Sequence, residues 1–328
     1  MQQAKNEHRG AVCQKRRRWK KVLMVLLAIP VVLAAVIAVL YLYMDNAPSI
    51  GKDFIKNIQT GGDIEQQYLQ WGSCETSRTT IKADGPIKKY TIYYPSELEA
   101  SGRKYPMVLI VNGTGGKATK YEPLLEHLAS WGFIVAGTQD KGTGTGKTTI
   151  ETLNYMLGEN ERSDSVFYGR IDVDNIGVTG HSQGGAAAIR AITMYEESSY
   201  FKTAVPLSPV SERTAEQTTN YPYDSADIHC PVFLLAGTSG EFEIEIVIPL
   251  EQMQKMYGKI TTPKIMARRT GMTHDDMLYQ AEGYVTAWFL WQLQGDQEAA
   301  KAFIGENPEI LSNALYQDAK VNLEGTGG

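Results

Sequence analysis

The chain has 328 residues, of which 43% are hydrophobic, and this apolar content excludes a disordered protein. The formal net charge of −5 hides an asymmetry, because residues 1–21 carry a net charge of +7 and the remaining residues carry −12. An acidic body argues against nucleic acid as a partner, since that affinity comes largely from neutralised phosphates, and three cysteines are too few for a disulfide-built fold.

The first predicted element is the segment 22–44, which runs for 23 residues without a charge. A helix of that length rises about 1.5 Å per residue and can cross a hydrocarbon core of roughly 30 Å. The basic segment 1–21 precedes it, so the positive-inside rule places residues 1–21 in the cytoplasm and residues 45–328 outside the cell membrane. A cleaved signal peptide, which would give a secreted protein, normally has a shorter apolar region of about 7–15 residues. We therefore predict a single-pass anchor in the lipid bilayer.

Residues 45–84 show no strong pattern and are expected to form a stalk or N-terminal extension, followed by one domain over residues 85–328. In that domain, short apolar, β-branched runs alternate with helical patterns. The predicted strands are Tyr90–Tyr94, Met107–Val111, Phe133–Gly137, Ile176–Thr179, Thr203–Leu207, Val232–Ala236 and Lys264–Ala267. The predicted helices are Tyr121–Trp131, Thr148–Leu157, Gly184–Glu197, Pro249–Tyr257 and Asp275–Leu293. This alternation predicts an α/β fold with a mostly parallel central sheet flanked by helices.

A candidate nucleophile lies between a predicted strand and a helix of small residues. Residues 180–184 read Gly-His-Ser-Gln-Gly, which is the G-x-S-x-G pattern in the strand–turn–helix context that it requires. The serine of such a turn stands above the sheet, and side chains at Gly180 and Gly184 would clash there. We predict that Ser182 is the nucleophile. His181 belongs to the same turn, and its side chain is expected to point away from the site.

The predicted base is His274, in the loop between the last strand and the last helix. In this type of site the chain order is serine, then acid, then histidine, and His274 arrives last. His127 lies within a predicted helix and is expected to have a structural role. Asp275 and Asp276 are expected in the first turn of the last helix, where they would complement its dipole rather than orient the imidazole.

The acid should follow the strand Val232–Ala236, where the loop contains no Asp. Three glutamates are available in this loop, Glu241, Glu243 and Glu245. We select Glu243, with Glu241 as the main alternative. At least one of the three is a solvated loop charge.

Two backbone amides are needed to bind the oxyanion that develops during acyl transfer. Gln183 directly follows the nucleophile and is one predicted donor. The second is Thr114, with Gly115 as the alternative, in the glycine-rich loop 112–116 after the strand Met107–Val111. The segment 141–148 resembles a phosphate-binding loop but has Lys141 where that pattern requires glycine, so we interpret it as a loop near the hydrolase site.

The ordered motifs NGTGG, GHSQGG, an acidic loop after VFLLAGT and a late histidine resemble the α/β-hydrolase superfamily over roughly residues 85–295. Within it the chain is similar to the dienelactone hydrolase, chlorophyllase and bacterial polyester hydrolase branch. The resemblance implies a small or polymeric ester substrate, a Ser-His-acid triad and no cofactor or metal. It matches Ser182, His274, Thr114 and Gln183 to motif positions. Glutamate instead of the usual Asp, and Asn112 instead of the common His or Pro, depart from the family pattern.

The resulting hypothesis is a membrane-anchored, extracytoplasmic serine hydrolase that cleaves carboxylic esters through an acyl-enzyme. Two alternatives stay open: an acyltransferase that uses the same triad, and a non-catalytic binding protein with this fold.

An oxidising compartment would allow Cys74 and Cys230 to form a disulfide, and a buried thiol is the other interpretation, above all for Cys230. The stretch 211–227 contains Tyr221 and Tyr223, which are either pocket residues or surface turn residues.

Overall fold

The computed structural model describes Met1, Met24, Leu27, residues 29–40, Tyr43, Asp45 and residues 47–324. The chain divides into two compact units, Met1–Pro48 and Ser49–Gly328. The predicted anchor 22–44 lies partly outside the described residues. In the part that is described, no helix is both long enough and apolar enough to cross a membrane. The anchor therefore stays a prediction.

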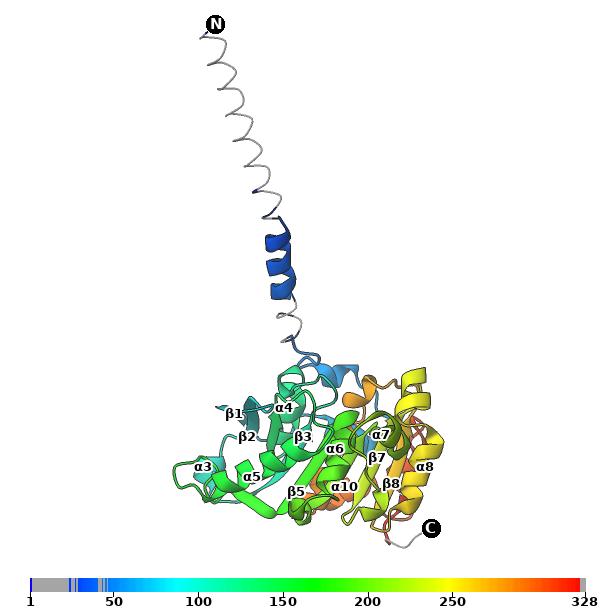
Figure 1. Ribbon diagram of the computed structural model, residues 1–328. Helices are drawn as coiled ribbons and strands as arrows, with labels where there is room; N and C mark the ends of the chain where they lie inside the picture. Colours follow the sequence, from blue (N-terminus) through cyan, green and yellow to red (C-terminus); the bar gives the residue numbers. More distant parts are fainter. Residues whose placement is uncertain are drawn as a thin grey trace. The chain divides into compact units, whose positions relative to one another are not determined.

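The second unit is built on one sheet, which has nine strands in the described chain in the order β1-β2-β4-β3-β5-β6-β7-β8-β9 (Figure 1). Neighbours from β4 through β8 are parallel, whereas the pairs that involve β1, β2 or β9 are antiparallel. The strands are β1 (Thr76–Lys82), β2 (Lys89–Pro95), β3 (Tyr105–Val111), β4 (Ile134–Thr138), β5 (Ile171–His181), β6 (Phe201–Leu207), β7 (Val232–Gly237), β8 (Lys264–Arg269) and β9 (Tyr316–Asn322). All seven predicted strands are present, which confirms the α/β class and the mostly parallel sheet.

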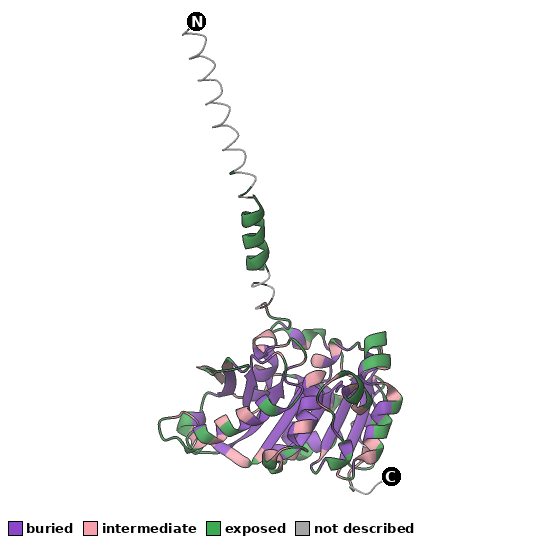
Figure 2. Ribbon diagram, viewed as in Figure 1, coloured by how far each residue is buried: buried purple, intermediate pink, exposed green. Residues whose placement is uncertain are grey.

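Helices cover both faces of this sheet, and Figure 2 shows the buried strands between them. The α-helices are α2 (Asp63–Leu69), α3 (Leu98–Ser101), α4 (Glu122–Ser130), α5 (Lys147–Glu161), α6 (Gln183–Ala191), α7 (Glu212–Thr218), α8 (Leu250–Lys259), α9 (Glu282–Phe289), α10 (Gln297–Ala300) and α11 (Glu309–Ser312). Shorter 3-10 or π segments are η1 (Phe54–Asn57), η2 (Ala118–Lys120), η3 (Glu196–Tyr200), η4 (Ser225–Asp227), η5 (Phe242–Val247), η6 (Asp276–Leu278) and η7 (Leu290–Gln294).

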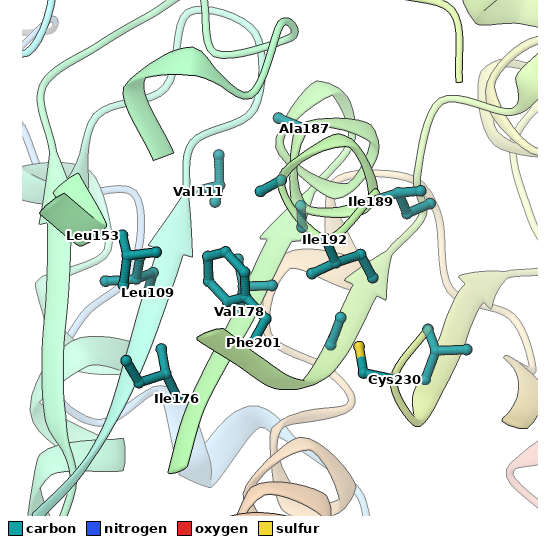
Figure 3. Close-up of a cluster of buried hydrophobic side chains, with 14 of the residues drawn as sticks. Leu109, Val111, Leu153, Ile176, Val178, Ala187, Ile189, Ile192, Phe201 and Cys230 are labelled. Atoms are coloured by element: carbon teal, nitrogen blue, oxygen red, sulfur yellow. The ribbon is translucent and has the colours of Figure 1, made fainter. Parts of the chain in front are cut away.

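Each face of the sheet buries its own apolar cluster. On one face, side chains of α5, α6 and α8 pack against β3, β5 and β6, and Figure 3 shows part of this cluster, including Leu153, Val178 and Ile189. On the other face, α2, α4 and α9 pack against β3, β4, β6 and β7. The central strands β3, β4 and β7 are buried along their whole length, which explains why their sequences are continuous apolar runs.

Residues 49–84 pack within the same compact unit as residues 85–328, whereas the sequence placed a domain boundary at residue 85. Ile50, Phe54 and Tyr68 are each at most 4% exposed and belong to the second apolar cluster. Strand β1 extends the sheet by pairing with β2. The compact unit therefore begins at Ser49.

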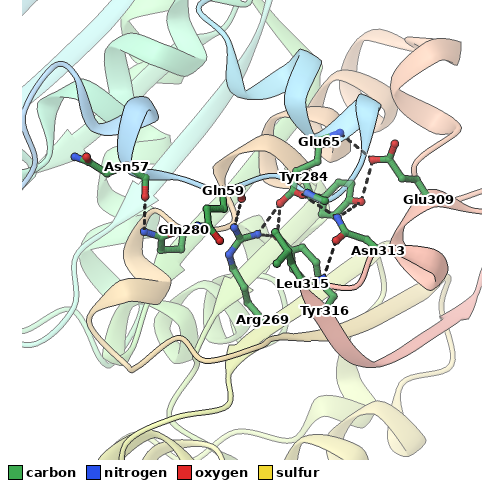
Figure 4. Close-up of polar contacts among 11 residues, drawn as sticks. Asn57, Gln59, Glu65, Arg269, Gln280, Tyr284, Glu309, Asn313, Leu315 and Tyr316 are labelled. Carbon is green, nitrogen blue, oxygen red and sulfur yellow. Dashed lines mark hydrogen bonds and ion pairs between the residues drawn. The ribbon is translucent and has the colours of Figure 1, made fainter.

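A buried ion pair fixes α2 to the far end of the sheet (Figure 4). The Oε1 atom of Glu65 lies 2.6 Å from Nη1 of Arg269 and accepts a 2.9 Å hydrogen bond from the Tyr316 hydroxyl. Asn313 Nδ2 donates to the other carboxylate oxygen of Glu65 at 2.8 Å. Segments more than 200 residues apart in the sequence are thus held together.

The predicted helix Asp275–Leu293 is divided into three parts. The chain forms η6, then turns, and only afterwards forms α9 and η7. Asp276 is accordingly not in the first turn of a long helix: its Oδ2 atom accepts hydrogen bonds from the backbone N–H of Thr273 (2.9 Å) and from the Thr273 hydroxyl (2.6 Å). These bonds brace the loop that carries His274.

Candidate active site

Ser182 occupies a strained turn between β5 and α6. Its backbone has φ 60° and ψ −123°, a conformation that non-glycine residues rarely adopt and that is typical of functional sites. A Cβ at Gly184 would overlap the carbonyl oxygen of Val111, and a Cβ at Gly180 would overlap the backbone of Gly184. The predicted steric need for both glycines is confirmed. The turn therefore presents the Ser182 side chain at the carboxyl end of the sheet.

An open cleft of about 730 Å³ lies above this turn. Ser182 and His274 both line it, together with the glycine-rich loop 113–116. The rest of its wall is formed by Ser49, Ile50, Lys120, Tyr121, His181, Phe242, Asp275, Asp276, Leu278 and Tyr279. The predicted nucleophile, base and oxyanion loop thus share one cleft.

The structure brings Glu243 and His274 together. The Oε2 atom of Glu243 lies 2.6 Å from Nδ1 of His274, and Glu243 is completely buried. Its Oε1 atom accepts hydrogen bonds from the Ser208 hydroxyl and from the backbone N–H of Gly237, each at 2.6 Å. The carboxylate is therefore held by three hydrogen-bond partners at the start of η5, in the segment that follows β7.

This environment favours the ionised form of Glu243. Burial by itself would raise the pKa of the carboxyl, but the hydrogen bonds from His274, Ser208 and Gly237 outweigh it and hold the pKa below its ordinary value. Glu241 and Glu245 are exposed to solvent. Of the three glutamates considered from the sequence, Glu243 is the one that contacts His274.

The glycine-rich loop approaches the Ser182 turn closely. A Cβ at Gly113 would lie 3.1 Å from the carbonyl oxygen of His181 and 3.5 Å from the Ser182 Cβ atom. The amide of Gly115 donates to the carbonyl oxygen of Lys141 at 2.9 Å, which leaves Thr114 as the better candidate for an oxyanion donor. Gln183 is the first residue of α6, where the N–H group has no partner within the helix.

Asn112, which sequence analysis noted only as a departure from the family, anchors this loop. Its Nδ2 atom donates to the carbonyl oxygens of Asp140 (2.6 Å) and Thr138 (3.0 Å), and its Oδ1 atom accepts from the Tyr121 hydroxyl. Its own carbonyl oxygen accepts a 2.6 Å bond from Thr143. Asn112 is 1% exposed, so these bonds form in a dry environment.

His181 was expected to point away from the site, and this expectation is wrong. Its side chain lines the cleft, its ring centroid lies 4.4 Å from that of His274, and its Nε2 atom lies 2.7 Å from the carbonyl oxygen of His274. Burial and the neighbouring His274 lower the pKa of His181 to about 3, so the ring is neutral near pH 7.

The remaining histidine and tyrosine candidates lie outside the cleft-lining residues of the described chain. His127 is completely buried, with Nδ1 3.0 Å from Glu282, in agreement with a structural role. Tyr221 accepts a hydrogen bond from the Gln183 side chain at 3.1 Å, and Tyr223 is buried and donates to the Val210 carbonyl oxygen at 2.7 Å. Neither tyrosine is among the residues that line the cleft at Ser182.

Cys74 and Cys230 are free thiols, so the disulfide considered from the sequence is not formed. Cys230 is 4% exposed, and burial raises its pKa to about 12. It is therefore an apolar core residue rather than a reactive thiol.

A strained serine turn after the fifth strand of a mostly parallel sheet, with a carboxylate–histidine pair from later loops, defines the class as the α/β-hydrolase superfamily. The model of the PETase family, described as PET hydrolase-like, matches residues 59–243, more than half of the chain. The chain belongs to this family, which confirms the resemblance to the polyester hydrolase branch.

Curated relatives agree with this assignment. The chain is 33% identical to cutinase est1 of Thermobifida alba over 151 residues, which cover 44% of this chain and 47% of the relative. It is 29% identical to the bis(hydroxyethyl) terephthalate hydrolase of Streptomyces coelicolor over 155 residues, 46% of each chain. The chain thus spans less than half the length of these curated relatives.

Proposed function

We propose that this chain is a serine hydrolase of carboxylic esters, with Ser182 as nucleophile, His274 as general base and Glu243 as the acid that orients it. The observation that carries the proposal is the 2.6 Å contact between buried Glu243 and His274, which lines the same cleft as Ser182. A histidine that is oriented by a carboxylate in this way activates a serine that is otherwise a weak nucleophile.

The protonation states support these roles. An ionised carboxylate only accepts hydrogen bonds, so the proton of the Glu243–His274 bond belongs to Nδ1 of His274. With Nδ1 as the donor, Nε2 is the ring nitrogen left to accept a proton. This atom takes the Ser182 hydroxyl proton as the oxygen attacks the ester carbonyl, and Glu243 stabilises the imidazolium that results.

The rest of the cycle follows from the same groups. The amides of Thr114 and Gln183 stabilise the oxyanion of the tetrahedral intermediate. His274 then protonates the leaving alkoxide, which gives an alcohol and an acyl-enzyme on Ser182. In the second half-reaction His274 activates water, and the acyl group leaves as a carboxylic acid.

The names of the relatives suggest which esters to try first. Proteins named as cutinases and as a bis(hydroxyethyl) terephthalate hydrolase match this chain, so cutin and esters of terephthalate are the proposed substrates. The cleft volume of about 730 Å³ lies within the range of roughly 300–1,000 Å³ that is usual for small-ligand sites.

We further propose that residues 22–44 anchor the protein in the cell membrane, with residues 45–328 outside. The support is the uncharged length of this segment and the basic residues before it. Membrane fractionation of the full chain, combined with N-terminal mass determination, tests this. A soluble product that lacks the first residues would show signal cleavage and secretion instead.

The hydrolase proposal is tested with p-nitrophenyl esters from acetate to palmitate and with bis(hydroxyethyl) terephthalate. Ser182→Ala should abolish turnover while the fold is retained, and Ser199→Ala, an exposed serine outside the cleft, serves as the matched control. Wild-type rates in Ser182→Ala would overturn the mechanism. Product analysis with an added alcohol separates hydrolysis from acyl transfer, and the absence of labelling by a fluorophosphonate would indicate a non-catalytic protein.

A further inference from the structure

Residues 49–57, here called the N-terminal wall, border the cleft although they lie outside the family match, which begins at residue 59. Ser49 and Ile50 line the cleft directly. We propose that this wall determines acyl-chain specificity, with Ile50 limiting the length of the acyl group that fits. The inference rests on the proposed ester hydrolase function and extends it to the substrate.

The N-terminal wall is fixed to the domain at both ends. The backbone amides of Ser49 and Ile50 donate to the carbonyl oxygen of Lys120 at 2.7 and 3.2 Å. At the other end, Gln280 Nε2 donates to the carbonyl oxygen of Asn57 at 3.4 Å (Figure 4). The wall therefore forms a set boundary of the cleft.

Between these ends, the Phe54 side chain holds the wall in place. It is 3% exposed, and its ring packs edge-on against Trp71, His127 and Tyr279 with centroid distances of 6.4, 5.8 and 6.4 Å. Tyr279 also lines the cleft. The wall thus contacts the substrate site through Ile50 and supports a second cleft residue through Phe54.

The chemistry of the reaction decides which part of the ester meets this wall. His274 must face the leaving oxygen in order to protonate it, so the acyl group extends to the other side of Ser182. The glycine-rich loop and Tyr121 line the same cleft as Ile50, whose backbone amide donates to the carbonyl oxygen of Lys120, directly before Tyr121. Ile50 is 4% exposed and offers an apolar branched surface that suits an alkyl group.

The Ile50→Ala variant of the full chain tests this proposal against an Ile58→Ala control. Both isoleucines are buried in the same apolar cluster, but Ile58 does not line the cleft. Two substrates that differ by one methylene in an apolar pocket can differ about 10-fold or more in kcat/KM. We expect the kcat/KM ratio of p-nitrophenyl octanoate to butyrate to rise about 10-fold in Ile50→Ala and to stay at the wild-type value in Ile58→Ala.

Two further measurements keep the outcomes distinct. If Ile50→Ala folds poorly, Ile50→Val takes its place as the test. It removes a single carbon from the side chain and should shift the octanoate-to-butyrate ratio in the same direction, by a smaller factor. The rates at which short- and long-chain alkyl fluorophosphonates label Ser182 report the shape of the cleft without requiring turnover.

An unchanged ratio in Ile50→Ala and Ile50→Val, or an equal shift in Ile58→Ala, would overturn the role of the wall while Ser182-dependent turnover still supports the hydrolase. If the wild type neither turns over an ester nor reacts with the probes, the hydrolase proposal fails, and this inference fails with it.

Discussion

The Nε2 atom of His181 lies 2.7 Å from the carbonyl oxygen of His274, and the two rings are 4.4 Å apart. This contact joins the turn that carries the proposed nucleophile to the loop that carries the proposed base. Because the pKa of His181 is lowered to about 3, its ring is neutral at working pH and Nε2–H is the donor. His181 is thereby a positioning residue for His274.

Replacing His181 tests this contact. His181→Phe retains an aromatic ring but removes the donor, and a hydrogen bond of this kind is worth about 1 kcal/mol. We expect kcat to fall roughly 5- to 10-fold with KM within about twofold, because the substrate contacts persist. Steady-state kinetics on a p-nitrophenyl ester measures this. His181→Gln, which restores an N–H donor, should recover part of the loss, and equal losses in both variants would assign His181 to packing alone.

The three glutamates after β7 provide a direct test of the acid. Glu243→Gln keeps the shape of the side chain but replaces the carboxylate that orients His274, and kcat should fall by a factor on the order of 10²–10⁴. Glu241→Gln and Glu245→Gln, which alter exposed side chains in the same segment, should stay within about twofold of the wild type. Similar small losses in all three would mean that the acid comes from elsewhere.

The central strands and the candidate triad could be predicted because their signals are local. Buried parallel strands are continuous apolar runs, the serine turn has a short motif, and chain order selects His274. No local sequence signal separates the three glutamates decisively. Burial separates them, since Glu243 is enclosed by Ser208 and Gly237 whereas Glu241 and Glu245 face solvent.

Features that depend on distant parts of the chain could not be predicted from the sequence. The segment 49–84 has no strong local pattern, and the contacts that hold it are long-range. Glu65 has its partners at Arg269 and Asn313, more than 200 positions away. Strand β1 is a polar edge strand with half-exposed side chains, so it has no apolar run. The orientation of His181 likewise depends on where the His274 loop meets the serine turn.

The buried Glu65–Arg269 pair should be essential for stability. Arg269→Met leaves the Glu65 carboxylate without its counter-ion in the interior, and we expect a loss of about 3–5 kcal/mol in the free energy of unfolding. Urea unfolding followed by circular dichroism measures this loss.

Two variants complete this test. Glu65→Gln combined with Arg269→Met removes both charges and should be more stable than Arg269→Met alone. Glu298→Gln breaks an exposed pair with Lys301 and should cost less than about 1 kcal/mol. A loss in Arg269→Met no larger than that in Glu298→Gln would show that the buried pair does not hold α2 to the sheet.

Glu282 should make stability depend on pH in the direction opposite to that of a typical carboxylate. Burial raises the pKa of Glu282, and its hydrogen bond to His127 offsets only part of this effect. The folded protein therefore binds the proton more tightly than the unfolded chain, whose glutamate pKa is about 4.3. This contribution is fully present below about pH 4.3 and is lost as the pH rises through the raised value in the folded state.

Glu282→Gln isolates this contribution because the amide is neutral at every pH and keeps a partner for His127. The stability difference, wild type minus variant, should decrease as the pH rises above about 4.3, with the free energy of unfolding measured in urea between pH 4 and pH 8. For Glu282→Ala, the wild-type-minus-variant difference should decrease with pH in the same way but be larger at every pH. This variant is less stable than Glu282→Gln because it leaves the buried Nδ1 of His127 without a partner. A difference that increases with pH would mean that Glu282 is held ionised by His127 and that its pKa lies below the ordinary value.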